Sequence, residues 1–169
     1  LLAAPDPAPA LAAMAASGVL LRLLPGAAAH LVAVLVHVEG AADLQPDWIR
    51  RLAALGGEDA ETTFRLSRAE ASRLIRLRDA MGSDMGAGEL GYRFGTTDAT
   101  DVLALRAALM TREIDPLQAE LALKGASQTL PVRAADLMPG VQGPKLGAQL
   151  KAIEDRWIAS GFALTASEL

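Results

Sequence analysis

Cysteine is absent from this 169-residue chain, and aromatic residues make up only 4% of it. Without cysteine there is no disulfide, no thiolate metal site and no cysteine nucleophile, and a reducing compartment is a natural setting. The scarcity of aromatic residues argues against a sheet-rich fold, because strands favour β-branched and aromatic side chains. Alanine, which dominates the sequence, favours closely packed helices. The composition therefore predicts an all-α fold.

Long hydrophobic runs are also missing. The longest, Leu31 to Val38, contains His37 and is far shorter than the roughly 20 residues that cross a bilayer. Residues 1–16 lack the basic region of a secretion signal, and the chain begins without Met, as a processed protein or part of a longer one would. We therefore expect a soluble, cytoplasmic protein, and the missing Met hints at a fragment.

Capping residues mark where helices begin. Ser67 and Glu70 form an S-x-x-E capping box, which predicts a helix over 68–81. The pairs Asp6-Pro7 and Asp115-Pro116 each place an N-cap residue before a proline, which is typical of a first helical turn. Together with the glycines that end helices, these signals predict an irregular array of about eight to ten helices.

The glycine-rich stretch 82–88 is the best candidate for a domain boundary. It predicts an N-terminal helical lobe over 1–82 and a C-terminal lobe over 83–169. Beyond the stretch we expect a short helix over 89–94 and a longer one over 98–110.

Apolar spacing separates the expected core from the surface. Arg50 and Arg51 are expected to point away from the apolar face of their helix. In the last helix the same spacing places Trp157 in the core, while Lys151 and Asp155 pair on the outside.

No catalytic motif is present in the sequence. It contains no H-E-x-x-H, P-loop or G-x-S-x-G pattern. Its two histidines, His30 and His37, lie on a mostly apolar helix, and we interpret them as core or boundary residues instead of metal ligands. The neighbouring acids Glu154 and Asp155 point in different directions and are interpreted as solvated surface. We therefore predict no catalytic residue, no metal site and no cofactor in this chain.

Arginine is concentrated between residues 65 and 78, where five arginines accompany one glutamate: Arg65, Arg68, Arg73, Arg76 and Arg78. Guanidinium groups bind phosphates through planar pairs of donors, so this cluster is a candidate for RNA binding. The alternative is a solvated helix face, since five arginines over four turns do not share one side. The net charge of −4 argues against a binder that uses its whole surface, and both interpretations stay open.

A turn over residues 139–145 adds one more basic candidate, Lys145. The N-terminus of the following helix and this lysine are suited to bind a phosphate. The turn resembles a helix-hairpin-helix motif that binds the DNA backbone, except that Gln142 separates Val141 from Gly143. A plain turn between two helices is the alternative interpretation.

Two patterns carry a resemblance to a known family. The first lies near the C-terminus and consists of Leu130-Pro131-Val132-Arg133, Asp136-Leu137, Gly140, Gly143-Pro144, Leu146-Gly147, Leu150 and Trp157-Ile158. The second opens the chain and consists of Leu1-Leu2-Ala3-Ala4-Pro5-Asp6-Pro7, Ala10-Leu11, Met14 and Gly18-Val19-Leu20. Together they resemble the region after the neck in bacterial tRNA nucleotidyltransferases, the CCA-adding and poly(A)-polymerase-like family. The resemblance covers nearly the whole chain.

The resemblance implies an RNA-binding body and tail. In that family a separate head, with a Gly-Ser phosphate-binding signature and an Asp-x-Asp metal pair, adds nucleotides with Mg²⁺ and CTP or ATP. No Asp-x-Asp pair occurs here, so we expect the chain to be inactive alone and to position tRNA for a head that it lacks. The expected partners are tRNA, the head and neck of the same polypeptide, and, as an option, a second copy. The expected RNA-binding residues are Arg65, Arg68, Arg73, Arg76, Arg78 and Lys145.

A helical interaction or dimerisation module without RNA contact is the alternative. It is motivated by the high alanine and leucine content and by the negative net charge. An independent enzyme is the least favoured class, because nothing supplies a nucleophile, a metal site or an acid–base pair.

Overall fold

A computed structural model describes residues 1–138, 140 and 143–169 as an all-α protein, which confirms the fold class predicted from sequence. Within these residues the helices are α1 (Ala8–Ala16), α2 (Val19–Leu23), α3 (Ala29–Ala41), α4 (Trp48–Leu55), α5 (Ala60–Thr63), α6 (Arg68–Met81), α7 (Ala87–Leu109), α8 (Pro116–Ala126), α9 (Ala134–Leu137) and α10 (Pro144–Ala159). None of the described helices is both long enough and apolar enough to cross a bilayer.

The helix starts follow the local sequence signals. Ser67 Oγ accepts a hydrogen bond from the Glu70 N–H at 3.3 Å, and Glu70 Oε2 accepts one from the Ser67 N–H at 2.7 Å, so the predicted capping box is confirmed. Asp115 accepts a hydrogen bond from the Leu117 N–H and caps α8. Helix α1 starts at Ala8, directly after the Asp6-Pro7 pair, and Asp6 accepts a hydrogen bond from the Ala8 N–H at 2.9 Å.

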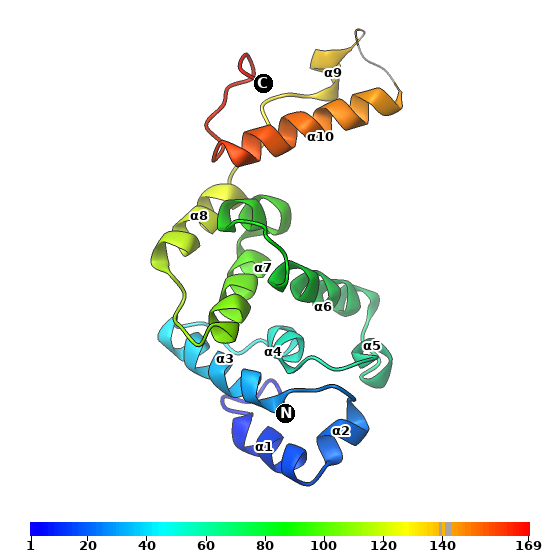
Figure 1. The fold of residues 1–169 in the computed structure, drawn as a ribbon, viewed down its shortest axis with the longest axis vertical. Helices are drawn as coiled ribbons and strands as arrows, with labels where there is room; N and C mark the ends of the chain where they lie inside the picture. Colours follow the sequence, from blue (N-terminus) through cyan, green and yellow to red (C-terminus); the bar gives the residue numbers. More distant parts are fainter. Residues whose placement is uncertain (139, 141–142) are drawn as a thin grey trace.

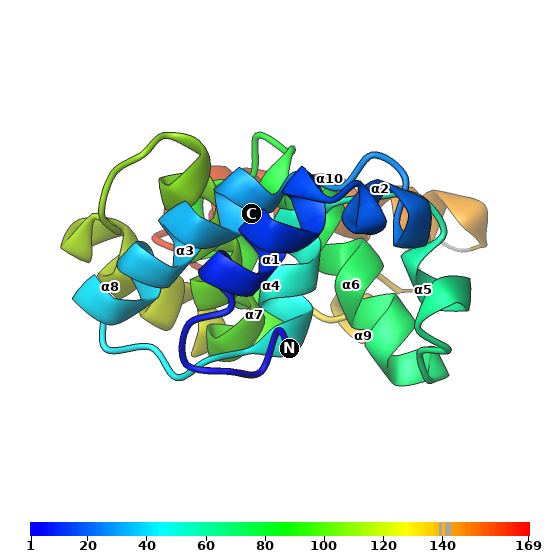
Figure 2. The same ribbon diagram turned by 90° about the horizontal axis from the view of Figure 1, so that it is seen from below.

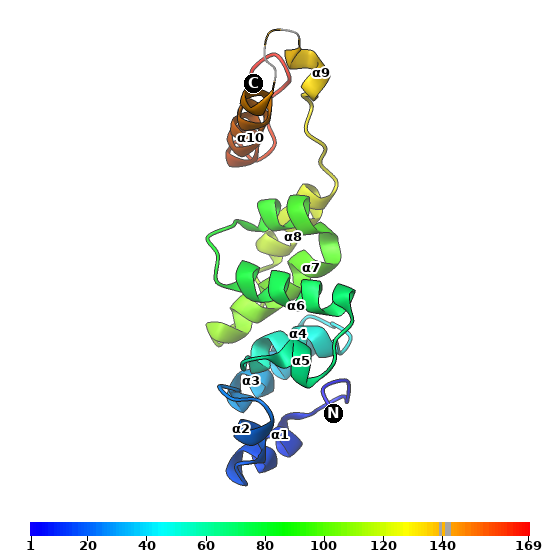
Figure 3. The same cartoon turned by 90° about the vertical axis from the view of Figure 1, so that its right-hand side faces the viewer.

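The helices stack into an elongated array. Figures 1 and 3 show α1, α2 and the N-terminus at one end, with α9 and α10 at the other. Figure 2 looks along the array and shows α4 and α6 beside α7. Helix α7 packs against α3, α4 and α6, so it is the central element of the fold.

One hydrophobic core runs from α1 to α8. It includes Leu35, Leu52, Leu77 and Leu105, all buried, and it is continuous across the 82/83 boundary that the sequence predicts between two lobes. The glycine-rich stretch therefore turns the chain within a single core.

Helix α7 is bent at Gly95, whose φ of 76° and ψ of 174° lie outside the helical region. The bend separates the short and long helices that the sequence predicts. Its first segment crosses α8 very closely, because a Cβ at Gly91 would lie 1.9 Å from the Ala122 carbonyl oxygen and a Cβ at Gly125 1.9 Å from the Gly88 carbonyl oxygen. Only glycine fits at these two positions.

The described C-terminal residues take no part in the continuous core. Val132, Ile153 and Trp157 are buried but lie outside the continuous core, and residues 130–133 form a non-helical connection. We call residues 130–169 the terminal unit and residues 1–126 the body. The predicted core position of Trp157 and the predicted pairing of Lys151 with Asp155, at 2.8 Å, are both found here.

Candidate nucleic-acid interface

The arginines between residues 65 and 78 fall into two groups. Arg65, in the connection between α5 and α6, and Arg68, at the start of α6, are exposed. Within the part of the chain that the structure describes, neither side chain makes a hydrogen bond or an ion pair. Both guanidinium groups are therefore available to an anionic ligand.

Arg73 and Arg76, in α6, instead contact carboxylates within the body. Arg73 donates to Asp47 at 2.9 Å and to Asp98 at 2.9 Å, and it also pairs with Asp101. Arg76 donates through Nε to Asp98 at 2.8 Å. These internal ion pairs occupy the donors that the sequence-based hypothesis assigned to RNA phosphates.

Arg78 also binds internal groups, but these are carbonyl oxygens. Its Nη2 donates to Gly56 O at 2.7 Å and its Nη1 to Gly57 O at 3.2 Å, so it satisfies carbonyls where α4 ends. Burial lowers the pKa of Arg78, since the attraction of Glu61 only partly offsets the loss of hydration. Its role in the fold is to cap α4.

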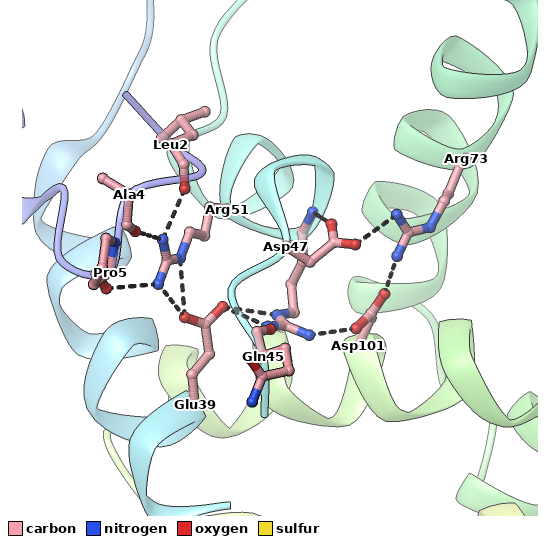
Figure 4. A network of polar contacts seen from close by, with 10 residues as sticks. Leu2, Ala4, Pro5, Glu39, Gln45, Asp47, Arg51, Arg73 and Asp101 are labelled. Carbon is pink, nitrogen blue, oxygen red and sulfur yellow. Dashed lines mark hydrogen bonds and ion pairs between the residues drawn. The ribbon is translucent and has the colours of Figure 1, made fainter. Parts of the chain in front are cut away.

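A charge network with a buried centre lies between α3, α4, α6 and α7, and Figure 4 shows part of it. It consists of Glu39, Asp47, Arg50, Arg51, Arg73, Arg76, Asp98 and Asp101. In the part of the network that Figure 4 draws, charges of opposite sign are neighbours: Glu39 lies beside Arg51, and Asp47 and Asp101 lie beside Arg73.

Arg50 and Arg51 differ most from the sequence-based expectation. They were expected to point away from the apolar face, but they are 3% and 1% exposed. Glu39 is the reason, because its two oxygens accept hydrogen bonds from Arg50 Nε at 2.8 Å and from Arg51 Nη2 at 2.7 Å. Arg50 also donates to Asp101 at 2.6 Å. A buried charge is tolerated when it is paired in this way.

Arg51 additionally fixes the start of the chain. Its guanidinium donates to Leu2 O at 2.7 Å and Pro5 O at 3.0 Å, and it also bonds Ala4 O. These hydrogen bonds hold residues 2–5, which are not helical, against α4.

The network also changes proton affinities. Burial raises the pKa of Asp47, but the hydrogen bonds from the Arg50 N–H and from Arg73 outweigh this and lower it overall. Burial likewise opposes the charge of Arg50, yet its hydrogen bonds and attraction to Asp101 and Glu39 raise its pKa. These groups are charged at neutral pH, as a structural network requires.

Lys145, the remaining basic candidate, lies exposed in the first turn of α10. Three residues of the turn before it, Pro139, Val141 and Gln142, lie outside the described residues, so the resemblance to a helix-hairpin-helix motif remains a prediction. The candidates left with exposed side chains are therefore Arg65, Arg68 and Lys145.

The two histidines lie on the surface of α3. His30 and His37 are both exposed, which corrects the expectation of core or boundary positions. Within the described residues no three His, Cys, Asp or Glu side chains converge in a way suited to a metal ion. Of the two acids interpreted from sequence as solvated, Asp155 is exposed, whereas Glu154 is partly buried and accepts a hydrogen bond from Tyr92. Both lie near Arg93 of the body.

An apolar groove of about 590 Å³ lies beside the N-terminus. Its walls come from α1, α2, α4 and the connection between α5 and α6. Leu23 and Phe64, which line it, are 44% and 38% exposed, and Arg65 also lines it. No sequence motif pointed to this groove, because its residues come from distant parts of the chain.

Taken together, the fold and these surfaces define an all-α protein in which Arg65 and Arg68 are exposed on the body and Lys145 on α10. Its described residues contain no cluster of His, Cys, Asp or Glu suited to a metal ion. Comparisons with protein-family models, with curated proteins and with solved structures find no match for this chain.

Proposed function

We propose that the chain is the C-terminal tRNA-binding region of a tRNA nucleotidyltransferase or poly(A)-polymerase-like protein. In this proposal it positions tRNA for 3′-end nucleotide addition by a catalytic head that these residues do not include. Mg²⁺ and CTP or ATP would be bound by that head.

The observation that carries the proposal is the C-terminal pattern that resembles this family. Its residues Val132 and Trp157 are buried together with Ile153 in the terminal unit. Packing therefore fixes two positions of the pattern, which supports a specific fold for this part of the chain.

The exposed cations support the RNA-binding part of the proposal. Arg65, Arg68 and Lys145 are the basic candidates whose side chains reach solvent without internal partners among the described residues. Replacing Arg73, Arg76 or Arg78 would disturb internal contacts, so such variants do not test RNA binding cleanly.

Titration of the chain with a tRNA acceptor minihelix at several salt concentrations tests the proposal. If three cations contact phosphates, the logarithm of the affinity falls with the logarithm of salt with a slope of about −2 to −3. Each of Arg65→Ala, Arg68→Ala and Lys145→Ala should reduce this slope by about 0.7 to 0.9. Arg112→Ala, an exposed arginine after α7, is the matched control and should leave the slope unchanged. Absent or salt-independent binding contradicts the proposal.

A helical interaction module is the second candidate, and the apolar groove favours it. Exposed apolar surface around a concave site is typical of protein contacts. If the module dimerises through the groove, sedimentation velocity should show a concentration-dependent dimer that Leu23→Glu abolishes. A monomer at all concentrations contradicts this second candidate.

A further inference from the structure

Aromatic residues gather where the terminal unit meets the body. The chain has one Tyr, two Trp and three Phe, and three of these six side chains meet here: Tyr92, Trp157 and Phe162. Their ring centroids are 5.0 to 5.9 Å apart, and Trp157 contacts both other rings edge to face. Such contacts stabilise beyond simple burial. We call these three residues the aromatic interface.

Polar contacts surround the aromatic interface. Tyr92 Oη donates a hydrogen bond to Glu154 Oε1 at 2.8 Å, which joins α7 to α10. Arg93, the next residue, lies 3.7 Å from Glu154 and 3.5 Å from Asp155. On the far side, Lys124 Nζ of α8 donates to Gly161 O at 2.9 Å. Tyr92 is therefore both the aromatic and the hydrogen-bonding contact of the body with α10.

Among the described residues, these contacts involve the C-terminal end of α10 and the residues after it, not its N-terminal end. In the described residues, the hydrogen bonds, ion pairs and ring contacts between the two parts involve residues 154–162 of the terminal unit. Lys145 lies nine residues before Glu154 in the same helix, which is roughly 14 Å along the helix axis at 1.5 Å per residue. Figure 1 shows α10 extending from the interface across the end of the array.

A small rotation at the aromatic interface would therefore displace Lys145 by a much larger distance than it displaces Trp157. The connection over 130–133 has no helical hydrogen bonds to resist such a rotation. Arg65 and Arg68, by contrast, belong to the body, whose core is continuous. The interface thus sets the distance of Lys145 from Arg65 and Arg68.

We propose that Tyr92 is a positioning residue, which holds the terminal unit against the body so that Lys145 binds the same RNA molecule as Arg65 and Arg68. The RNA part rests on the proposed function, whereas the docking of the terminal unit does not. Two weak contacts that are held at a fixed spacing act as one stronger site, because the second contact is then intramolecular. Release of the terminal unit removes this advantage without removing any cation.

Docking is tested first, by the accessibility of Trp157. In a Trp48→Phe background Trp157 is the single tryptophan, and its quenching by acrylamide reports on its exposure, which is 3% in the intact chain. Tyr92→Ala should raise the quenching constant at least about twofold, and Tyr92→Phe, which keeps the ring but loses the hydroxyl, should raise it less. If Tyr92→Ala does not fold by circular dichroism, Tyr92→Phe and Glu154→Gln replace it. Unchanged quenching in the folded variants overturns the docking role.

Positioning is tested by a double-mutant cycle on the affinity for the tRNA acceptor minihelix. Lys145→Ala should weaken binding when Tyr92 is present and have little effect in the Tyr92 variant, because a displaced lysine contributes little. Lys151→Ala, a second exposed cation on α10, is the matched control and should have no effect in either background. An equal loss from Lys145→Ala in both backgrounds overturns the positioning role. A chain that binds no RNA at all overturns the proposed function and the positioning role with it, whereas the docking role is judged by quenching alone.

Discussion

In the body, eight charged side chains, five of them buried, join α3, α4 and its N-cap, α6 and α7. The terminal unit, by contrast, meets the body through three aromatic rings and a few partly exposed polar contacts. A buried charge network is intolerant of change, since each charge that loses its partner stays desolvated. An aromatic contact is less demanding, because it needs neither charge balance nor exact hydrogen-bond geometry. The two parts should therefore respond differently to substitution.

The difference also changes the interpretation of the basic residues. Five arginines close together in the sequence suggest one basic surface. In the structure, however, Arg73, Arg76 and Arg78 bind carboxylates or carbonyl oxygens within the body. The acidic partners, Asp98 and Asp101, come from the next helix, α7. Proximity in sequence is therefore a poor guide to the charge of the surface.

Glu39→Gln should have the largest effect. The amide keeps the shape of the carboxylate but leaves Arg50 and Arg51 without their shared negative charge in a buried site. We expect a loss of about 3 to 5 kcal/mol in the free energy of unfolding, measured by urea denaturation. Glu113→Gln, an exposed glutamate, is the control and should change little. A loss below about 1 kcal/mol would show that the network is not what stabilises the body.

Gly91→Ala should have the next largest effect. The new methyl group would meet the Ala122 carbonyl oxygen at 1.9 Å, so α7 and α8 must separate. We expect a destabilisation of about 3 kcal/mol, measured by thermal or urea unfolding. The control is Gly147→Ala in α10, where an added methyl group would meet no atom within 4 Å and alanine should stabilise the helix by about 0.5 to 1 kcal/mol. Equal effects at the two sites would contradict the close crossing.

Much of the helical framework could be predicted from the sequence, because its signals are local. The capping box at Ser67 and the Asp115 cap act within three residues of the helix start, and the bend at Gly95 follows from a glycine between two apolar patterns. The burial of Trp157 was likewise predicted from helical spacing. Such features depend on neighbours that are visible in the sequence itself.

The buried charges could not be predicted in this way. Arg50 and Asp101 are 51 positions apart, and Arg51 and Glu39 are 12 positions apart, so no short-range pattern joins them. Charged residues are also expected at the surface unless a partner is known. The one usable signal was Glu39 near the end of an apolar helix, followed by two adjacent arginines on the next helix. The candidate site was therefore predicted only in part: Arg65, Arg68 and Lys145 are exposed, and the other three candidates have internal partners.

Asp47→Asn should have a smaller effect that depends on pH. Asparagine can still cap α4 but cannot form the ion pair with Arg73, so we expect a loss of about 1 to 2 kcal/mol at neutral pH. The pKa of Asp47 is lowered in the folded state, so its charge contributes fully above the ordinary value of 3.8 and the contribution is lost as the pH falls below it. The difference between the two proteins, measured by urea unfolding from pH 7 to pH 3, should therefore shrink toward acid. A difference that grows toward acid would contradict this sign.

Lys151→Ala should have the smallest effect, and it tests the comparison from the side of the terminal unit. Lys151 and Asp155 form an ion pair at 2.8 Å like those of the body, but their side chains are 70% and 49% exposed. Water and salt screen such a pair, and alanine is the better helix former, so the free energy of unfolding should change by no more than about 0.5 kcal/mol. The same variant measured in low and high salt separates the two contributions, because only the ion pair responds to salt. A loss above about 1 kcal/mol would mean that ion pairs stabilise the terminal unit as they do the body. The contrast between a body stabilised by charge pairs and a terminal unit held by aromatic contacts would then fail.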